Sequence, residues 1–337
     1  MKKKWSVLIL VCGLVIAAAA WFAYDDLLRY AATPAGAGGQ TDSKIVTIEK
    51  GQNFRQATQV LLAQKLIEHP LKFRILGRLQ GRDKQVQAGE YRLSADMSPG
   101  DILEVLVSGK VRLYRFTVPE GSNLKQIAAI VETAGLVTRA EFLSAASDAD
   151  FLRKNGIAAA SFEGYLFPDT YLFPKNTAAR EIIGVMLELL HAAFTETWKN
   201  RAAEIGLSVH QVLTLASIIE KETGAPVERP IISAVFHNRL RRGMRLETDP
   251  TVIYGVDDFD GNLTRKHLTT PTPYNTYQIS GLPPGPIASP GRAAIEAALY
   301  PADTPFLYFV SKKDGTHQFS TNLADHNRAV LTYQLKK

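Results

Sequence analysis

The feature that most constrains this chain is an uncharged run near its N-terminus, residues 5–24, WSVLILVCGLVIAAAAWFAY. As a helix, such a run is about 30 Å long, which matches the hydrocarbon core of a bilayer. Trp5, Trp21 and Tyr24 lie at its two ends, where the aromatic belts of membrane spans lie. The sequence therefore predicts a transmembrane helix over residues 5–24.

The charges on either side of this run indicate its orientation. Lysines precede it in residues 1–4, and Asp25 and Asp26 follow it. By the positive-inside rule, residues 1–4 are a cytoplasmic tail and the rest of the chain lies outside the cytoplasm, as in a single-pass protein of the cell inner membrane with a periplasmic body. The alternative is a cleaved signal peptide, because the four alanines 17–20 resemble a cleavage site. Both interpretations export the body of the protein.

Composition limits the classes of function. The 337 residues suffice for two domains. Lysines 2–4 supply half of the formal net charge of +6 and no long basic run follows, so nucleic acid is not an expected partner. The single cysteine, Cys12, lies in the apolar run, which excludes an internal disulfide framework and a cysteine metal site. No zinc spacing, phosphate-binding glycine loop or G-x-S-x-G elbow occurs, so we expect neither metal nor cofactor.

The exported part begins with a predicted linker over residues 25–44, rich in glycine, alanine and small polar residues from residue 31 on. A strand, a glycine turn and a helix follow within residues 44–67. The same pattern returns within residues 115–137, where Thr117, Gly121, Asn123 and Gln126 repeat Thr47, Gly51, Asn53 and Gln56 at a constant offset. With two copies this is an internal duplication. The strand and helix predicted between the copies, in residues 87–111, suggest a LysM-like module, and a small packing domain without ligand is the alternative.

Aromatic residues and carboxylates alternate in residues 161–174, SFEGYLFPDTYLFP. Glu163 and Asp169 lie among five aromatic residues there. Such a stretch suits the binding of sugar rings, and a hydrophobic core is the alternative.

A largely buried helix is predicted from Ser208, which forms a capping box with Gln211, to a stop at Gly224. Glu220 adjoins its apolar stripe, whereas Glu222 lies about 200° round the helix from it. In a partly dry environment the Glu220 carboxyl could hold and return a proton near neutral pH. The alternative is a solvated glutamate at a helix end, although a glutamate there opposes the helix dipole.

Two loops and a hairpin complete the chain. Residues 238–255 carry Glu247, Asp249 and Tyr254, and residues 269–291 combine six prolines with Tyr274, Asn275 and Tyr277. A long loop of this content is disordered or functional, and its large polar residues favour an ordered binding loop. Residues 308–330 predict a hairpin with an Asp-Gly turn, then a helix near whose start Asn322 and His326 lie.

Five stretches of the chain resemble the YceG-like (MltG) family of endolytic murein transglycosylases, in order and over essentially the whole chain after the linker. They are EGYLFPDTY, LASIIEKETG, RLETDPTVIYG, YNTYQISGLPPGPIASPG and FSTNLADHN. The resemblance implies an α+β protein with an N-terminal transmembrane helix, a LysM-like subdomain over residues 45–160 and a small α+β catalytic subdomain over residues 161–337. It implies a lyase that cleaves nascent peptidoglycan glycan strands between N-acetylmuramic acid and N-acetylglucosamine, leaving 1,6-anhydro-muramyl ends in cell-wall assembly. The family's catalytic glutamate is then Glu220.

A lytic transglycosylase can work with one carboxyl group, because a hydroxyl of the substrate itself replaces water. We expect Glu163, Asp249, Tyr254, Tyr277 and Asn322 to line the substrate site. The alternatives are a hydrolase with Asp249 or Glu247 as a second carboxylate, and a peptidoglycan-binding scaffold without catalysis. Peptidoglycan synthases at the inner membrane are the expected protein partners.

Overall fold

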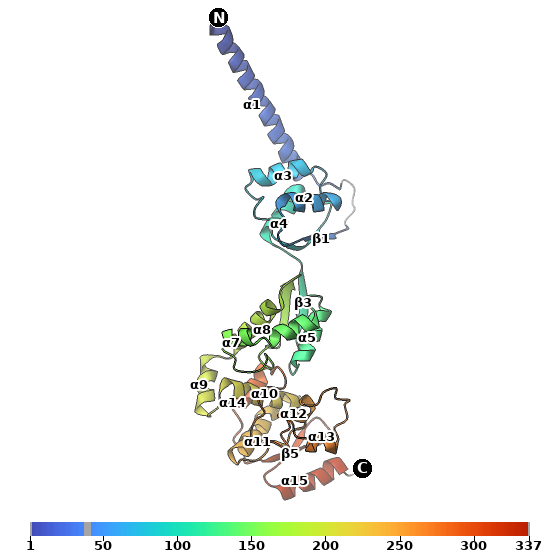
Figure 1. The fold of residues 1–337 in the computed structure, drawn as a ribbon, viewed down its shortest axis with the longest axis vertical. Coiled ribbons are helices and arrows are strands. Elements are labelled where there is room, and N and C mark those ends of the chain that lie inside the picture. The colour runs from blue at the N-terminus through green and yellow to red at the C-terminus, as the bar shows by residue number, and fades with distance from the viewer. Residues whose placement is uncertain (1, 37–41, 336–337) are drawn as a thin grey trace. The chain divides into compact units, whose positions relative to one another are not determined.

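The computed structural model describes residues 2–36 and 42–335 of a mixed α+β protein. The chain forms two compact units, one of residues 1–114 with 174–176 and one of residues 115–173 with 177–337. Figure 1 shows the order of the elements along the chain. Met1 of the expected tail and residues 37–41 of the expected linker lie outside the described residues.

The first unit begins with α1 (Lys2–Ala32), whose stretch Val7–Ala32 is long and apolar enough to cross a membrane. Its further elements are β1 (Lys44–Ile48), α2 (Phe54–Ala63), α3 (Pro70–Leu79), β2 (Gly89–Leu93) and α4 (Pro99–Ser108). The strands β1 and β2 pair antiparallel, with Val46 opposite Tyr91. Alternate residues of both strands are buried against the helices, as period-2 patterning requires.

The first residues of the expected linker over residues 25–44 are helical in the structure. Helix α1 continues to Ala32, and Leu27 is buried in the core of the first unit with Tyr30 and Ala31 packed against it. Burial of these side chains keeps the chain helical beyond the apolar run, which sequence composition alone did not reveal.

The predicted duplication is confirmed at the level of single hydrogen bonds. Asn53 and Gln56 form a capping box at the start of α2, and Asn123 and Gln126 form the same box at the start of α5 (Leu124–Thr133). The glycine before each box has a positive φ, which residues with a Cβ rarely adopt. The second copy lies in the second unit, so the expected subdomain boundary at residue 160 falls inside that unit.

The second unit is mainly helical. Before its central helix it contains α5, α6 (Arg139–Ala146), α7 (Ala149–Lys154), α8 (Ala179–Ala193) and α9 (Glu196–Glu204). The central helix and those after it are α10 (Val209–Glu222), α11 (Arg229–Arg241), α12 (Asp249–Tyr254), α13 (Arg265–Thr269), α14 (Arg292–Leu299) and α15 (Leu323–Val330). The strands β3 (Leu113–Thr117) and β4 (Thr170–Pro174) form one two-stranded sheet, and β5 (Tyr308–Ser311) and β6 (His317–Ser320) form another.

The apolar spacing of residues 178–202 predicts one amphipathic helix. This prediction is wrong, because α8 ends before Phe194 and α9 starts after Thr195. The ring of Phe194 is buried and packs edge-on against Trp198, with ring centroids 5.7 Å apart. This contact fixes the corner between the two helices.

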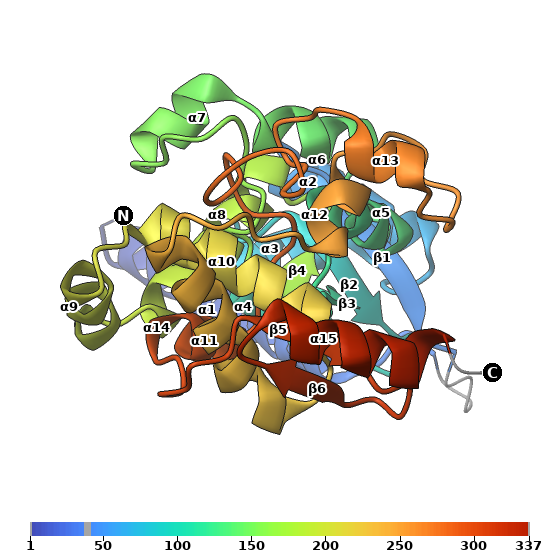
Figure 2. The ribbon, with the colours of Figure 1, turned by 90° about the horizontal axis from the view of Figure 1, so that it is seen from below.

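Helix α10 is the centre of the second unit. It contacts α9, α11, α12 and α14, and Figure 2 shows it lying among α11, α12 and α14. The packing carries its C-terminal end into the interior of the unit.

Candidate active site

The sequence of α10 makes it a helix whose middle is enclosed on every face. Its start is fixed by the predicted capping box, in which the Ser208 hydroxyl accepts a hydrogen bond from Gln211 N at 3.2 Å and Gln211 Oε1 accepts one from Ser208 N at 2.8 Å. The consecutive residues 212–219 are all buried, so neighbouring elements cover every face. The chain becomes extended at Thr223, which ends the helix. Both glutamates of its last turn therefore meet protein.

Glu220 is held by two partners. Its Oε1 accepts a hydrogen bond from an Arg229 guanidinium nitrogen at 3.3 Å, and its Oε2 accepts one from Gly291 N at 2.9 Å. The Glu220 side chain is 6% exposed. Glu120 lies against the same place, since a Cβ on Gly291 would overlap its carboxylate. Burial, and then the charge of Glu220, raise the pKa of Glu120.

Glu222 faces a different environment. It accepts a hydrogen bond from the Thr248 hydroxyl and lines a cavity of about 360 Å³ in the second unit. The lining residues of this acid cavity are Glu222, Arg239, Leu246, Glu247, Asp249, Tyr277, Tyr308, Phe309, Val310, Leu323, His326 and Val330. Glu222 is thus held by Thr248 and is one of the residues that line a space of ligand size.

Burial raises the pKa of Glu222 to about 7, and the charge of Asp249 adds to the effect. The Thr248 hydrogen bond and the charges of His317 and Arg239 act in the opposite direction. A carboxyl group with a pKa near 7 exists in both protonation states at neutral pH, which suits a group that donates a proton and then takes one back.

Asp249 and Tyr277 lie together in the acid cavity, as expected of site residues. Asp249 is the first residue of α12, and Tyr277 comes from the proline-rich loop. The Tyr277 hydroxyl donates a hydrogen bond to Asp249 Oδ1 at 2.8 Å. Burial raises the pKa of Tyr277, so its hydroxyl stays protonated and can donate.

The opposite wall of the acid cavity is built around Arg239. Its guanidinium donates to the carbonyl oxygens of Leu307 and Leu246, at 2.7 and 2.9 Å, and lies over the ring of Tyr308. The ring of Tyr308 in turn stacks on His326, with centroids 5.2 Å apart. Burial, then the charge of Arg239, lower the pKa of His326 and favour the neutral imidazole. This wall offers flat rings beside a fixed cation.

Glu163 and Tyr254 form a separate cluster. The Glu163 carboxylate accepts hydrogen bonds from Leu124 N, at 3.0 and 3.1 Å, and from the Tyr254 hydroxyl at 3.1 Å. The ring of Tyr254 contacts Tyr274, with centroids 4.7 Å apart. Burial raises the pKa of Glu163 to about 7. These contacts tie the start of α5 to α12, and neither residue is part of the acid cavity.

Asn322 caps a helix. Its side-chain oxygen accepts a hydrogen bond from Asp325 N at 2.9 Å, and its amide donates to the Asp325 carboxylate at 2.8 Å. The next residue, Leu323, lines the acid cavity. Asn322 therefore positions α15, one wall of the cavity, from outside it.

The sequence singled out Glu220, whose side chain is 6% exposed in the structure. It did not single out Glu222, which lies about 200° away on the same turn and also contacts protein. Arg239, Tyr308 and Phe309 were not singled out at all. Arg239 begins the stretch RLRRGMRLE, and Tyr308 and Phe309 begin the stretch YFVS. Both stretches mix polar or aromatic residues with apolar ones, and such a mixture does not distinguish a cavity wall from a core.

The described ranges, residues 2–36 and 42–335, contain no group of three or more His, Cys, Asp or Glu side chains placed to hold a metal ion. The acid cavity itself combines three carboxylates with a fixed arginine, two tyrosines and a histidine. This arrangement can protonate, hydrogen-bond and stack on a polar ring compound.

Comparisons with known proteins identify relatives of this chain. The YceG-like family model matches residues 46–332. The endolytic murein transglycosylase of Bacillus subtilis (strain 168) is 33% identical over 313 residues, which cover 87% of this chain and 86% of the relative. The endolytic murein transglycosylase of Streptococcus pneumoniae serotype 2 (strain D39) is 29% identical over 98% of this chain and 65% of the relative.

A crystal structure of a yceG-like protein from Listeria monocytogenes superposes with a TM-score of 0.59 at 33% sequence identity, covering 86% of this chain and 99% of that one. The family match spans both units, from the second residue after the start of β1 to two residues past the end of α15. The family model and the relatives together show that the chain belongs to the YceG-like family.

Proposed function

We propose that this protein is a membrane-anchored endolytic lytic transglycosylase of peptidoglycan. It cleaves glycan strands between N-acetylmuramic acid and N-acetylglucosamine, and it leaves 1,6-anhydro-muramyl ends, which makes it a lyase of cell-wall assembly. The relative from Bacillus subtilis, named an endolytic murein transglycosylase, matches 87% of the chain and supports this assignment. The observation that carries the chemistry is a glutamate of pKa about 7 at the base of a cavity.

Glu222 is our preferred acid. Protonated, it would donate its proton to the glycosidic oxygen as the bond to C1 of the muramyl residue breaks. The Glu222 carboxylate would then take the proton of the 6-hydroxyl of the same sugar, whose oxygen bonds to C1. The carboxyl group ends as it began, and no water enters, because the attacking hydroxyl is held in place by the ring itself.

Glu220, the glutamate that the motif resemblance assigns, is the alternative acid. Both of its oxygens already accept hydrogen bonds, from Arg229 and from the backbone of Gly291. A role in holding the last turn of α10 against these two segments fits such contacts better than proton transfer does. The variants below separate the two assignments.

For substrate contacts we propose Asp249 and Tyr277, which share the acid cavity with Glu222. Tyr277 donates to Asp249 and so fixes the direction in which this carboxylate can accept hydrogen bonds from sugar hydroxyls. Glu163, Tyr254 and Asn322, also expected to contact substrate, are engaged in contacts between elements, and we assign them a positioning role.

A hydrolase is the second candidate, favoured by one observation: Glu247 and Asp249 line the same cavity as Glu222. Either carboxylate could activate a water molecule opposite the acid, and the product would then have a reducing end. A scaffold without catalysis would have no use for a carboxyl group of raised pKa facing this cavity.

The location follows the same proposal. The apolar helix α1 would anchor the enzyme in the cell inner membrane as a single pass, with its N-terminus cytoplasmic and both units periplasmic. The first unit after the linker would be the LysM-like, glycan-binding part, and residues 161–337 would carry catalysis. An enzyme placed there meets new strands as they leave peptidoglycan synthases, its proposed partners.

The deciding experiment is the product mass of uncrosslinked glycan strands treated with the full-length protein. We expect products lighter by one water than hydrolysis products. Glu222→Gln should abolish them, while Glu220→Gln, a matched variant two residues away on the same helix, should retain them in a folded protein. The reverse pattern would return the catalytic role to Glu220. Reducing-end products would identify a hydrolase, and Glu247→Gln and Asp249→Asn would then locate its second carboxylate.

A further inference from the structure

Helix α3 of the first unit exposes an unusual face. Leu71, Ile75 and Leu79 are 65%, 42% and 66% exposed, and their spacing of four residues places them on one side of the helix. Arg74 and Arg78 lie beside them. Apolar residues with long basic side chains at their flank are typical of helices that lie in a membrane interface, where the cations reach the phosphates.

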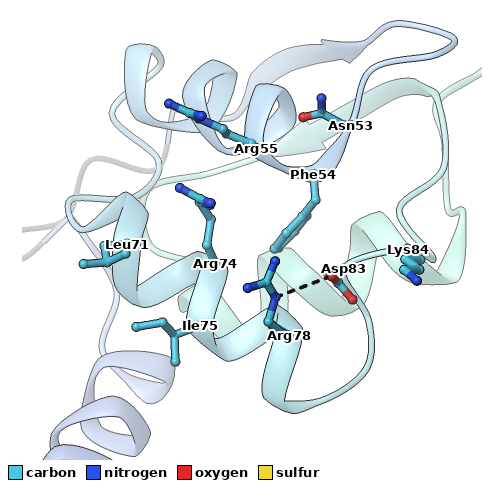
Figure 3. Close-up of a pocket in the computed structure, with 9 residues that line it drawn as sticks. All are labelled: Asn53, Phe54, Arg55, Leu71, Arg74, Ile75, Arg78, Asp83 and Lys84. Carbon is cyan, nitrogen blue, oxygen red and sulfur yellow. Dashed lines mark ion pairs between the residues drawn. The ribbon is translucent and has the colours of Figure 1, made fainter.

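The arginines lead into a cavity of about 380 Å³ between α3 and the start of α2. Figure 3 shows Arg55 of α2 and Arg74 and Arg78 of α3 around this space. Lys84 adds a fourth cationic side chain, and Asp83 is the single carboxylate of the lining. Asp83 lies 4.0 Å from Arg78, and Arg55, Arg74 and Lys84 form no ion pair within residues 2–36 and 42–335. The basic cavity therefore has an excess of positive charge that the protein does not neutralise.

The position of α3 on α1 identifies the partner. Lys72 pairs with Asp26 at 2.7 Å and lies over the ring of Tyr30 at 5.8 Å. Asp26 is two residues beyond the uncharged run 5–24, about 3 Å along the helix axis. The headgroup layer extends about 5–7 Å beyond the hydrocarbon core on each side. If α1 spans the membrane, as the proposed function requires, α3 starts at headgroup level.

We propose that α3 and the basic cavity dock on the membrane surface and bind phosphates of anionic phospholipids in the leaflet next to the C-terminal end of α1. Leu71, Ile75 and Leu79 insert among the upper acyl chains. Arg74 and Arg78 contact the lipid phosphates, and Arg55 and Lys84 extend the positive surface. A neutral glycan would match neither the exposed aliphatic row nor the excess of cations, so lipid fits both features together.

This docking would restrict the motion of the first unit relative to the bilayer more than the single span α1 does. A single span leaves α1 and the first unit packed on it free to tilt and rotate together in the bilayer, whereas a second contact through α3 holds the unit to the bilayer surface. The docking rests on the anchoring part of the proposed function and not on the chemistry at Glu222.

The test uses the full chain in nanodiscs of phosphatidylcholine, with and without phosphatidylglycerol. An environment-sensitive dye is attached at the native Cys12, or at Ile75→Cys or Ile45→Cys in a Cys12→Ser background, and quenching by brominated lipid is measured. Ile45, on β1 in the same unit, is a matched control, because its 44% exposure is close to that of Ile75. Figure 1 shows β1 at the end of this unit away from α1.

We expect strong quenching at residue 12 in both lipids, and quenching at residue 75 that exceeds that at residue 45 and increases with phosphatidylglycerol. Arg74→Gln and Arg78→Gln should each lower the ratio of docked to undocked protein about fivefold, the effect of one basic residue near an anionic surface. Arg92→Gln, an exposed arginine on β2, should leave it unchanged.

Equal quenching at residues 75 and 45, with residue 12 quenched, would overturn the docking while leaving the anchor intact. Strong quenching at residue 75 that ignores phosphatidylglycerol and both arginine variants would overturn the role of lipid phosphate. A water-exposed dye at residue 12 would contradict the anchor and the docking together. None of these outcomes touches glycan cleavage, which the product masses test separately.

Discussion

At the scale of single residues, two glutamates on one helix turn have different surroundings. Glu220 accepts hydrogen bonds from Arg229 and Gly291, whereas Glu222 meets Thr248 and an open cavity. Two residues along an α-helix correspond to a rotation of about 200°, enough to send the two side chains into different compartments. In an enclosed helix both compartments lie inside the protein.

The pH dependence of cleavage should report Glu222. Because the proton-donating form prevails below a pKa of about 7, we expect kcat/KM to fall as pH rises through 7. Thr248→Val removes a hydrogen bond that lowers this pKa, so the falling limb should move to higher pH. Steady-state rates on defined glycan strands across the pH range measure the shift. Glu220→Gln serves as the control and should leave the pH at which kcat/KM falls unchanged. If that pH changes in Glu220→Gln but not in Thr248→Val, the assignment of Glu222 is contradicted.

The motif predicted the segment that carries the site and two of its cavity residues, Asp249 and Tyr277. The motif assigns catalysis to Glu220, and helical periodicity does not point to Glu222, because it locates only the most apolar face. The pairing of Glu163 with Tyr254 was hidden for a different reason. A glutamate that accepts hydrogen bonds from the start of a helix and one that contacts sugar look the same in a sequence.

At the scale of elements, the same strand, glycine turn and capped helix occurs twice, once in each unit. The capping hydrogen bonds are nearly identical: 3.0 and 2.8 Å between Asn53 and Gln56, and 2.9 Å for both bonds between Asn123 and Gln126. Local sequence alone predicted these helix starts, because a cap is satisfied within four residues. The corner between α8 and α9 was missed, because it depends on the burial of Phe194 by distant segments.

Each cap should stabilise its own helix. We expect Asn53→Ala and Asn123→Ala each to cost about 1 kcal/mol. Amide hydrogen exchange should quicken in α2 for the first variant and in α5 for the second, because the two helices belong to different units. Exchange that quickens equally in both helices for either variant would refute this independence.

Glu163 should hold two elements of the second unit together. Replacing it with alanine leaves Leu124 N and the Tyr254 hydroxyl without their acceptor. A buried donor left unpaired costs about 1–3 kcal/mol. The free energy of unfolding measured by urea titration should therefore fall by that amount. Glu188→Ala, an exposed residue of α8, is the control. If Glu163 instead contacted substrate, its variant would keep full stability and lose affinity for glycan strands.

At the scale of the whole molecule, two buried acids make stability depend on pH. Burial raises the pKa of both Glu163 and Glu222 from 4.5 to about 7. Between these pH values the folded protein therefore keeps protons on both carboxyl groups that the unfolded chain has released. Their contribution to stability is complete below about pH 4.5 and is lost as pH rises through 7. The loss is at most about 3 kcal/mol for each group.

Removing either ionisable group should flatten this decline. We expect the free energy of unfolding of Glu163→Gln and of Glu222→Gln to fall less between pH 4.5 and pH 8 than that of the parent protein, as measured by urea titration at each pH. Glu188→Gln should follow the parent curve. A parent protein that grows more stable over this interval would show that other groups dominate.

The acid cavity also sets an order in time. Glu222 stands in the middle of the second unit, but Leu323, His326 and Val330 of α15 close the cavity from the far end of the chain. One wall of the acid cavity is therefore missing until α15 has been synthesised and has packed against the rest of the second unit. Any chemistry that depends on this cavity must wait for that step.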